Sequence, residues 1–191
     1  MAQQVQDKRS LRTRAWIVQA FNELIFQRTY SRLPTDYIIK RAGVGRSTFY
    51  EHFRNKDEVL LQSVSWILSA FADGATDAAS GYRIRGVLDH ILEQNTMAGP
   101  LLVGPGGAAI AAELSKLIEI RLTTQNASRG VRLFVPARLA ARQVAAAQLS
   151  LLINWLEGAS TCSANDLATA ICRSSQALVA SLEHSEAAAR S

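Results

Sequence analysis

The chain has 191 residues, of which 48% are apolar, with 21 Lys or Arg, 16 Asp or Glu and a formal net charge of +5. This length and apolar content allow a packed core in one or two domains. The amino terminus has no apolar run of signal-peptide length, and no later segment supplies about 18 uninterrupted apolar residues. We therefore expect a cytoplasmic protein without a membrane segment.

The two cysteines, Cys162 and Cys172, lie ten residues apart and have no histidine pair near them. This spacing excludes a zinc-ligand set, and we expect neither a metal site nor another cofactor. Two free thiols are the simplest interpretation, and a redox switch or an inter-subunit disulfide is the alternative.

The first predicted helix runs from about Lys8 to Arg28, where apolar residues recur at three- and four-residue intervals. The recurring residues are Trp16, Ile17, Ala20, Phe21, Leu24 and Ile25. This helix is expected to brace the segment that follows it.

Residues 33–57 predict two short helices joined by a tight turn at Gly43, where glycine can adopt a positive φ. The second helix begins near Gly45 or Arg46. The residues expected to face inward are Ile38, Ile39, Ala42, Val44, Phe49 and Phe53. The residues left to face outward on the second helix are Arg46, Ser47, Thr48, Tyr50 and His52. This outward polar face suits a DNA groove, so the segment predicts a helix-turn-helix.

The basic excess lies entirely in the amino-terminal part of the chain. Residues 1–57 hold 11 Lys or Arg against 5 Asp or Glu, a net charge of +6, and residues 58–191 hold 10 against 11, a net charge of −1. Such a distribution is expected when only one end meets phosphate, although a solvated basic tail would show it too. Arg9, Arg12 and Arg14 would form a flexible arm on the DNA backbone, or remain solvated.

Residues 42–60 also carry a specific series of short motifs. They are Ala42-Gly43-Val44, Arg46-Ser47-Thr48-Phe49-Tyr50, His52-Phe53, Asn55-Lys56-Asp57 and Leu60. Through these motifs the first third of the chain resembles the TetR (tetracycline-repressor-like) family of bacterial transcription regulators. Two positions depart from the commoner pattern: Pro34, followed by Thr35, stands where many members have a capping threonine, and Gly45 replaces a serine or threonine. Glycine is a tolerable N-cap, so the second helix should still form.

Side-chain chemistry suggests roles for the outward residues. Arg46 can donate two hydrogen bonds to guanine O6 and N7, and the two hydroxyl residues after it can bond base edges or phosphate. The resemblance implies that Tyr50 and Lys56 clamp phosphates; Tyr50 could instead pack on the module, and His52 either touches phosphate or is a plain surface histidine. The predicted DNA contacts are Thr35, Arg46, Ser47, Thr48, Tyr50, His52 and Lys56.

Helical periodicity predicts five further helices in the rest of the chain, over about 57–79, 82–97, 108–126 and 137–157, and one that starts after Asn165 as its N-cap. Residues 99–107, GPLLVGPGG, interrupt this series and predict a bend without a phosphate-loop motif. The bend is either a connection with buried leucines or a wall of the small-molecule cavity that the resemblance suggests. The candidate cavity residues, each of which could equally be ordinary core, are Trp66, Phe71, Leu88, Met97, Leu101, Leu102 and Trp155.

The last two predicted helices each carry an apolar stripe. The stripe residues are Leu149, Leu152, Ile153 and Leu156 on the first helix, and Leu167, Ile171, Leu178 and Leu182 on the second. The resemblance implies that this helix pair docks against its copy as a four-helix dimer interface, and an intramolecular core is the alternative.

These observations together predict an all-α protein with an amino-terminal helix-turn-helix three-helix module (1–57) and a helical ligand-binding and dimerisation bundle (58–191). The expected function is a homodimeric transcriptional regulator, a repressor that binds a palindromic double-stranded DNA operator and is released by a small apolar effector. The alternative is a helical small-molecule-binding protein without specific DNA binding. An enzyme is not expected, because His52, His90 and His184 show no spacing typical of a metal site or catalytic triad.

Overall fold

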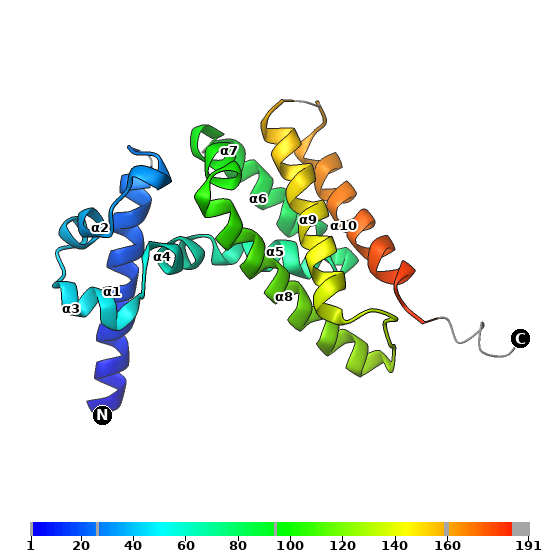
Figure 1. Ribbon diagram of the computed structural model, residues 1–191, viewed down its shortest axis with the longest axis horizontal. Coiled ribbons are helices and arrows are strands. Elements are labelled where there is room, and N and C mark those ends of the chain that lie inside the picture. The colour runs from blue at the N-terminus through cyan, green and yellow to red at the C-terminus, as the bar shows by residue number, and fades with distance from the viewer. Residues whose placement is uncertain (1, 26, 94, 159–160, 185–191) are drawn as a thin grey trace, which may run out of the picture. The chain divides into compact units, whose positions relative to one another are not determined.

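A computed structural model describes residues 2–25, 27–93, 95–158 and 161–184 of the chain. Within these residues the fold is all-α, as predicted, and consists of ten α-helices and two 3-10 turns (Figure 1). The helices are α1 (Ala2–Ile25), α2 (Thr35–Ala42), α3 (Arg46–His52), α4 (Lys56–Ser63), α5 (Ser65–Gly74), α6 (Gly81–Glu93), α7 (Asn95–Val103), α8 (Pro105–Arg129), α9 (Ala137–Leu156) and α10 (Ala164–Ser181). The 3-10 turns are η1 (Tyr30–Arg32) and η2 (Ala78–Ser80). None of the described helices is both long and apolar enough to cross a membrane.

The chain forms two compact units. Met1–Ser65 and Pro100–Ala109 make up the first, called the head unit below, and Trp66–Gly99 and Ile110–Ser191 make up the second, called the body unit. Compactness alone assigns no function, so the division into a DNA-binding domain and a ligand-binding domain stays a prediction.

The tight turn between α2 and α3 forms as the sequence predicts. Gly43 has φ 66°, and the turn is closed by hydrogen bonds from its own N–H to the Lys40 carbonyl and from the Val44 N–H to the Ile39 carbonyl, both 3.3 Å. These bonds satisfy carbonyls that the end of α2 would otherwise leave open. Gly45 is the N-cap of α3, with an extended backbone. The helix therefore forms without a capping hydroxyl.

The head unit has a continuous apolar core. Its fully or nearly fully buried side chains include Ile17, Phe21, Leu33, Ile38, Phe49, Phe53, Val59 and Leu60. Phe49 and Phe53 point inward, as their four-residue spacing predicts, and their ring centroids lie 6.0 Å apart. Because this core holds one face of α3 fixed, the opposite face is presented to solvent.

The helix predicted from Asp57 to Ala79 is wrong in its extent, because it is interrupted at Val64 and ends at Gly74. Serine hydroxyls flank the interruption: Ser65 Oγ donates to the Gln62 carbonyl at 2.9 Å, and Ser63 Oγ donates to Asn22 Oδ1 on α1 at 2.5 Å. Serine side chains that bond nearby groups in this way compete with regular helical bonding. The first segment of the head unit ends at this interruption, with Ser65 as its last residue.

The segment predicted as a bend, residues 99–107, is mostly helical. The break is confined to Gly104, between α7, which contains Pro100, and α8, which starts at Pro105. A Cβ atom on Gly107 would lie 1.8 Å from the Leu102 carbonyl oxygen, so only glycine allows the first turn of α8 to approach α7 this closely. One on Gly106 would come within 3.3 Å of Leu101, Leu60 and Tyr30.

Glutamine side chains from three helices bind the end of α5 and the turn that follows it in the body unit. Gln148 of α9, Gln176 of α10 and Gln125 of α8 donate from Nε2 to the carbonyls of Phe71, Gly74 and Thr76 at 3.1, 3.1 and 2.8 Å. The last carbonyls of a helix have no intrahelical partner, so the amides of Gln148 and Gln176 supply donors to Phe71 and Gly74.

The last two helices lie close to their predicted positions. The N-cap of α10 is Ser163 instead of the predicted Asn165, since Ser163 Oγ accepts from the Asp166 N–H at 3.1 Å. Beyond α10, the chain returns to the segment before α9 through an isolated antiparallel bridge between Leu133 and Glu183. Both cysteines are free thiols. Burial, assisted by the charge of Asp77, raises the pKa of Cys172 and so disfavours its reactive thiolate.

Candidate nucleic-acid interface

The outward face of α3 carries most of the predicted DNA contacts. Arg46, Ser47 and Tyr50 are exposed, while Thr48 and His52 are half-buried. The Tyr50 ring is 48% exposed and also meets the Phe49 ring edge-on, with 5.3 Å between centroids. Tyr50 therefore packs on the module and still leaves half of its surface accessible. Thr35 is half-buried and is the first residue of α2, which follows Pro34 as N-cap.

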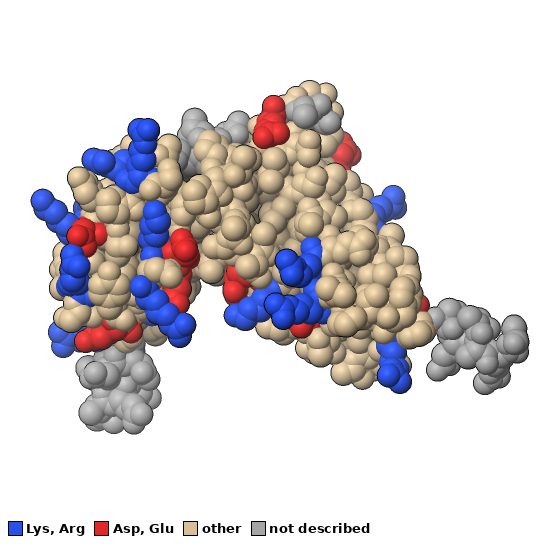
Figure 2. Space-filling model, in the orientation of Figure 1, with Lys and Arg blue, Asp and Glu red and all other residues tan. Residues whose placement is uncertain are grey.

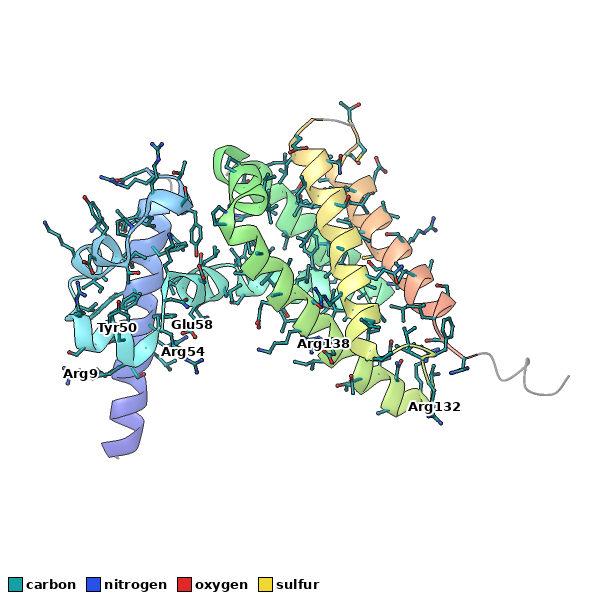
Figure 3. The ribbon with its side chains drawn as sticks, viewed as in Figure 1. Arg9, Tyr50, Arg54, Glu58, Arg132 and Arg138 are labelled. Atoms are coloured by element: carbon teal, nitrogen blue, oxygen red, sulfur yellow. The ribbon has the colours of Figure 1, made fainter. Side chains whose placement is uncertain are left out.

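The head unit shows the basic surface expected from its composition. Figure 2 shows lysine and arginine side chains spread over α1 to α4, with a few acidic side chains between them. Arg54, in the turn after α3, has 89% of its side chain exposed. Its backbone N–H donates to Glu58 Oε2 at 2.8 Å, while Asn55 Oδ1 accepts from the Glu58 N–H at 3.0 Å. This reciprocal cap fixes the turn that presents Arg54 (Figure 3).

Two exposed residues of this surface, Tyr37 and Arg54, were not among the predicted contacts. Tyr37 lies on α2 with 46% of its surface exposed, and the Arg28 guanidinium lies 4.7 Å from the centroid of its ring. The sequence could have indicated that Tyr37 is exposed, because it directly precedes the inward-facing Ile38 and adjacent residues of a helix point in different directions.

Lys56 is half-buried and makes hydrogen bonds within the head unit. Its Nζ donates to the carbonyls of Tyr30 and Leu33 at 2.9 and 3.2 Å and lies 4.5 Å from the centroid of the Tyr30 ring. The Tyr30 hydroxyl bonds Asp57, and burial together with this carboxylate raises the pKa of Tyr30, which keeps the phenol neutral. In this structure Lys56 ties η1 to the start of α4 through two of its three N–H donors, and its contact with phosphate stays a prediction.

A structural role for Lys56 predicts a specific loss of stability. Lys56→Met keeps the apolar stem and removes the donor, so we expect the free energy of unfolding of the head unit to fall by about 1 kcal/mol. Lys40→Met is the matched control, because Lys40 is an exposed lysine on α2. Denaturant titration of both variants checks the prediction, and equal stability of the two variants would contradict it.

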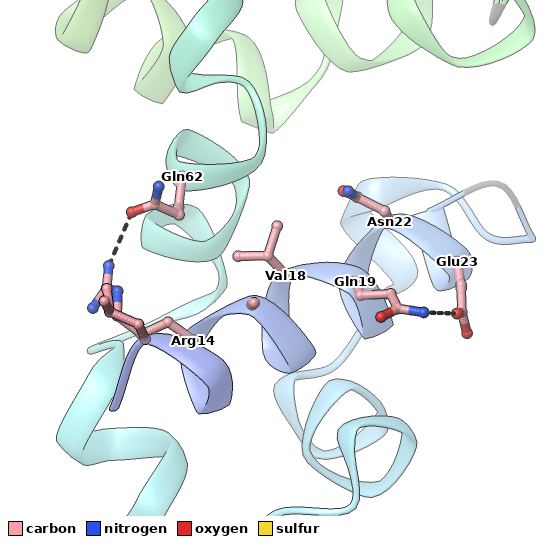
Figure 4. Close-up of a pocket in the computed structure, with 8 residues that line it drawn as sticks. Arg14, Val18, Gln19, Asn22, Glu23 and Gln62 are labelled. Atoms are coloured by element: carbon pink, nitrogen blue, oxygen red, sulfur yellow. Dashed lines mark hydrogen bonds between the residues drawn. The ribbon is translucent and has the colours of Figure 1, made fainter. Parts of the chain in front are cut away.

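Arg14 is part of the folded head unit and not of a flexible arm. It lies within α1, where it donates to the His52 carbonyl at 2.7 Å and to Gln62 Oε1 at 3.0 Å, and its guanidinium is 4.3 Å from the centroid of Phe53. The expectation of a mobile Arg14 is therefore wrong, because its partners on α3 and α4 hold it in place. Arg14 also lines an open hollow of about 590 Å³ along α1, together with Val18 and Gln62. Figure 4 shows these side chains.

The predicted cavity residues do not lie in one unit. Leu101 and Leu102 belong to the head unit, whereas Trp66, Phe71, Leu88 and Trp155 belong to the body unit. Phe71 and Leu88 are buried in the body core, and Trp66 is 49% exposed with its ring 5.2 Å from the His90 ring centroid. Trp155 donates from Nε1 to the Cys162 carbonyl at 3.0 Å. The side chain of Met97 lies outside the described residues.

The predicted dimer residues divide into two groups. Leu152, Leu167 and Ile171 are buried within the body unit itself, so in this structure they belong to the core of one chain. The remaining residues are half-buried and keep surface that a second copy could cover: Leu149, Ile153, Leu156, Leu178 and Leu182. Their part in a dimer stays a prediction.

The family of the chain follows from its head unit. Residues 17–62 match the sequence model of the bacterial regulatory proteins of the tetR family, and they include the turn at Gly43, the whole of α3 and the Phe49–Phe53 pair. Residues 17–62 therefore carry the helix-turn-helix segment typical of the tetR family. This match, together with the helix-turn-helix described above, supports a TetR family transcriptional regulator.

Two relatives of known sequence match the same end of the chain. The HTH-type dhaKLM operon transcriptional activator DhaS of Lactococcus lactis subsp. lactis (strain IL1403) is 33% identical over 76 residues, which are 39% of this chain and 38% of DhaS. The uncharacterized HTH-type transcriptional regulator YxbF of Bacillus subtilis (strain 168) is 29% identical over 75 residues, 39% of this chain and 20% of YxbF. The match thus spans well under half the length of either relative.

Solved structures are similar over most of the chain. A TetR transcriptional regulator from Streptococcus agalactiae 2603V aligns with a TM-score of 0.54 and 22% identity over 90% of this chain and 98% of its own. Thermus thermophilus FadR, a TetR family repressor in complex with lauroyl-CoA, aligns with a TM-score of 0.56 and 18% identity over 85% of this chain and 92% of its own. At these identities the likeness concerns the fold.

Proposed function

We propose that this TetR-family regulator is a repressor that binds a palindromic operator as a homodimer and is released by a small apolar effector. The observation that carries the proposal is the exposed polar face of α3, which stands on a fixed apolar core within a segment of net charge +6. Buried Phe49 and Phe53 orient the helix, and exposed Arg46, Ser47 and Tyr50 are free to meet a groove and its phosphates.

We assign DNA binding to residues 1–57, and effector binding and dimerisation to residues 58–191. The half-buried leucines and isoleucine of α9 and α10 are the proposed dimer seam, because two heads related by a twofold axis read a palindrome. Among proteins of similar fold, the Thermus thermophilus repressor holds lauroyl-CoA, which supports an effector with apolar character. DhaS is named an activator, so activation is the competing direction of control.

The alternative is a helical small-molecule-binding protein without specific DNA binding. Selection of bound sites from a random DNA library separates the two functions. We expect enrichment of a palindrome, with half-sites about one helical turn apart or a multiple of it. Failure of the folded protein to enrich any sequence would favour the alternative.

The same selection tests Arg46 as a base-reading residue. Arg46→Ala is expected to lower discrimination at one guanine position by about 1 to 3 kcal/mol. Arg54→Ala is the matched control, because an exposed arginine in the turn after α3 is placed for phosphate and should weaken all DNA about equally. Equal losses on selected and random DNA for Arg46→Ala would contradict the base-reading role.

A further inference from the structure

The base-reading arginine has an acidic partner on the neighbouring helix. Asp36, in the first turn of α2, accepts a hydrogen bond through Oδ1 from a terminal nitrogen of Arg46, the first residue of α3, at 2.7 Å. The Arg46 and Asp36 side chains are 66% and 63% exposed, so the pair stands on the surface of the head unit. An acid beside the start of α3 runs against the basic character of this segment, and in the first turn of α2 its charge also interacts favourably with the amino-terminal end of that helix.

We propose that Asp36 is a specificity-determining residue that acts through Arg46, and this inference rests on the proposed base-reading role of Arg46. A free arginine side chain samples many rotamers, and a base contact must restrict them. The carboxylate of Asp36 occupies one donor of the guanidinium and restrains its plane. A guanidinium has five N–H donors, so enough remain to bond both O6 and N7 of a guanine. Asp36 thus holds the arginine in a conformation that can bind guanine.

The charge of Asp36 contributes to discrimination in a second way. Non-specific binding depends on phosphate neutralisation, and one negative charge close to the phosphates weakens it on every sequence. Arg46 paired with Asp36 is also less available as a general phosphate contact. On a site with the correct guanine the two base-edge hydrogen bonds offset this loss, whereas on other sites nothing does. Asp36 should therefore lower binding to random DNA more than binding to the operator.

The test measures binding of wild type, Asp36→Asn, Arg46→Ala and the double variant to three DNA duplexes by fluorescence anisotropy. The duplexes are the selected operator, the same operator with the guanine read by Arg46 replaced, and random sequence. For Asp36→Asn we expect random-sequence affinity to rise about two- to fivefold near 0.1 M salt, because one repulsive charge is lost. Discrimination at the guanine should fall about fivefold, a part of what loss of the whole arginine would cause.

The Arg46→Ala background isolates the orienting effect. In that background Asp36→Asn should leave discrimination at the guanine unchanged while still raising random-sequence affinity. Glu51→Gln is the matched control, because it removes one exposed carboxylate from α3 without touching the Asp36–Arg46 pair. It should leave discrimination at the wild-type value.

Three results would overturn the inference. The first is that Asp36→Asn discriminates at the guanine as well as wild type does. The second is that Asp36→Asn lowers discrimination as much in the Arg46→Ala background as in wild type. The third is that Arg46→Ala alone keeps full discrimination. If wild type distinguishes none of the duplexes, the proposed operator binding itself fails. If wild type discriminates, Arg46→Ala does not, and Asp36→Asn matches wild type, only the role of Asp36 fails. Circular dichroism of each variant verifies that the fold is retained.

Discussion

Replacement of Phe49 by alanine is expected to unfold the head unit while the body unit stays folded. Phe49 has no exposed surface and packs against the buried Phe53 ring and the half-exposed Tyr50 ring. Truncating a buried phenylalanine to alanine costs about 3 to 5 kcal/mol. A unit as small as the head has little more stability than this to lose. The body unit has its own core, which includes Phe71, Ile84 and Leu88, and should not feel the change.

Amide hydrogen exchange resolved along the chain checks this expectation. In Phe49→Ala we expect protection to be lost in α2, α3 and α4 and kept in α9 and α10. Tyr50→Phe is the control, because it removes only the hydroxyl of the adjacent, half-exposed ring, and surface changes of this kind are usually within about 0.5 kcal/mol. Equal loss of protection in both units would show that they unfold as one cooperative structure.

The second large effect is expected at the junction of α7 and α8. In Gly107→Ala the new Cβ would lie 1.8 Å from the carbonyl oxygen of Leu102, a backbone atom that cannot move without shifting the end of α7. Overpacking of this kind costs typically 1 to 3 kcal/mol, and we expect about 3 kcal/mol here because the obstacle is backbone. The junction lies in the Pro100–Ala109 segment of the head unit, so head-unit stability should fall.

Gly86→Ala is the matched control for Gly107→Ala. Gly86 lies within α6, and a Cβ there would meet nothing within 4 Å. The same substitution should therefore stabilise the protein by up to about 1 kcal/mol through helix propensity and a more restricted unfolded chain. Thermal unfolding of wild type and the two variants checks both predictions: the melting temperature should fall in Gly107→Ala and rise in Gly86→Ala. A melting temperature for Gly107→Ala equal to that of wild type would mean that the close approach of α7 and α8 is not required.

Where the determinants are close in sequence, the fold and the candidate interface followed from the residues alone. Ala42-Gly43-Val44 closes the turn through bonds to carbonyls at most five residues away, and the spacing of Phe49 and Phe53 sets which face of α3 is inward. The exposure of Arg46, Ser47 and Tyr50 then follows from the geometry of a single helix. Charge counting likewise located the basic end of the chain without any structure.

Helix boundaries near breaks were less accessible from the sequence. Propensity alone favoured one helix through Val64 and a bend through residues 99–107, yet the observed break at Val64 is accompanied by the bond from Ser63 to Asn22 of α1. The close approach of Gly107 to Leu102 places the second break at Gly104 alone. The first break involves a contact with α1, and the second involves a backbone contact between the end of α7 and the start of α8; helix propensity accounts for neither contact.

What the sequence by itself determined is the local design of the head: a glycine turn, a helix with an apolar and a polar face, and a basic net charge around them. Only the tertiary structure decided the partners of long side chains, such as Lys56 on η1 and Arg14 on the end of α3, because those partners lie more than twenty residues away. It also decided which members of an apolar stripe are core. Periodicity defines the apolar face of a helix, but the neighbouring helices decide that Leu152 and Ile171 are covered within one chain and that Leu178 keeps accessible surface.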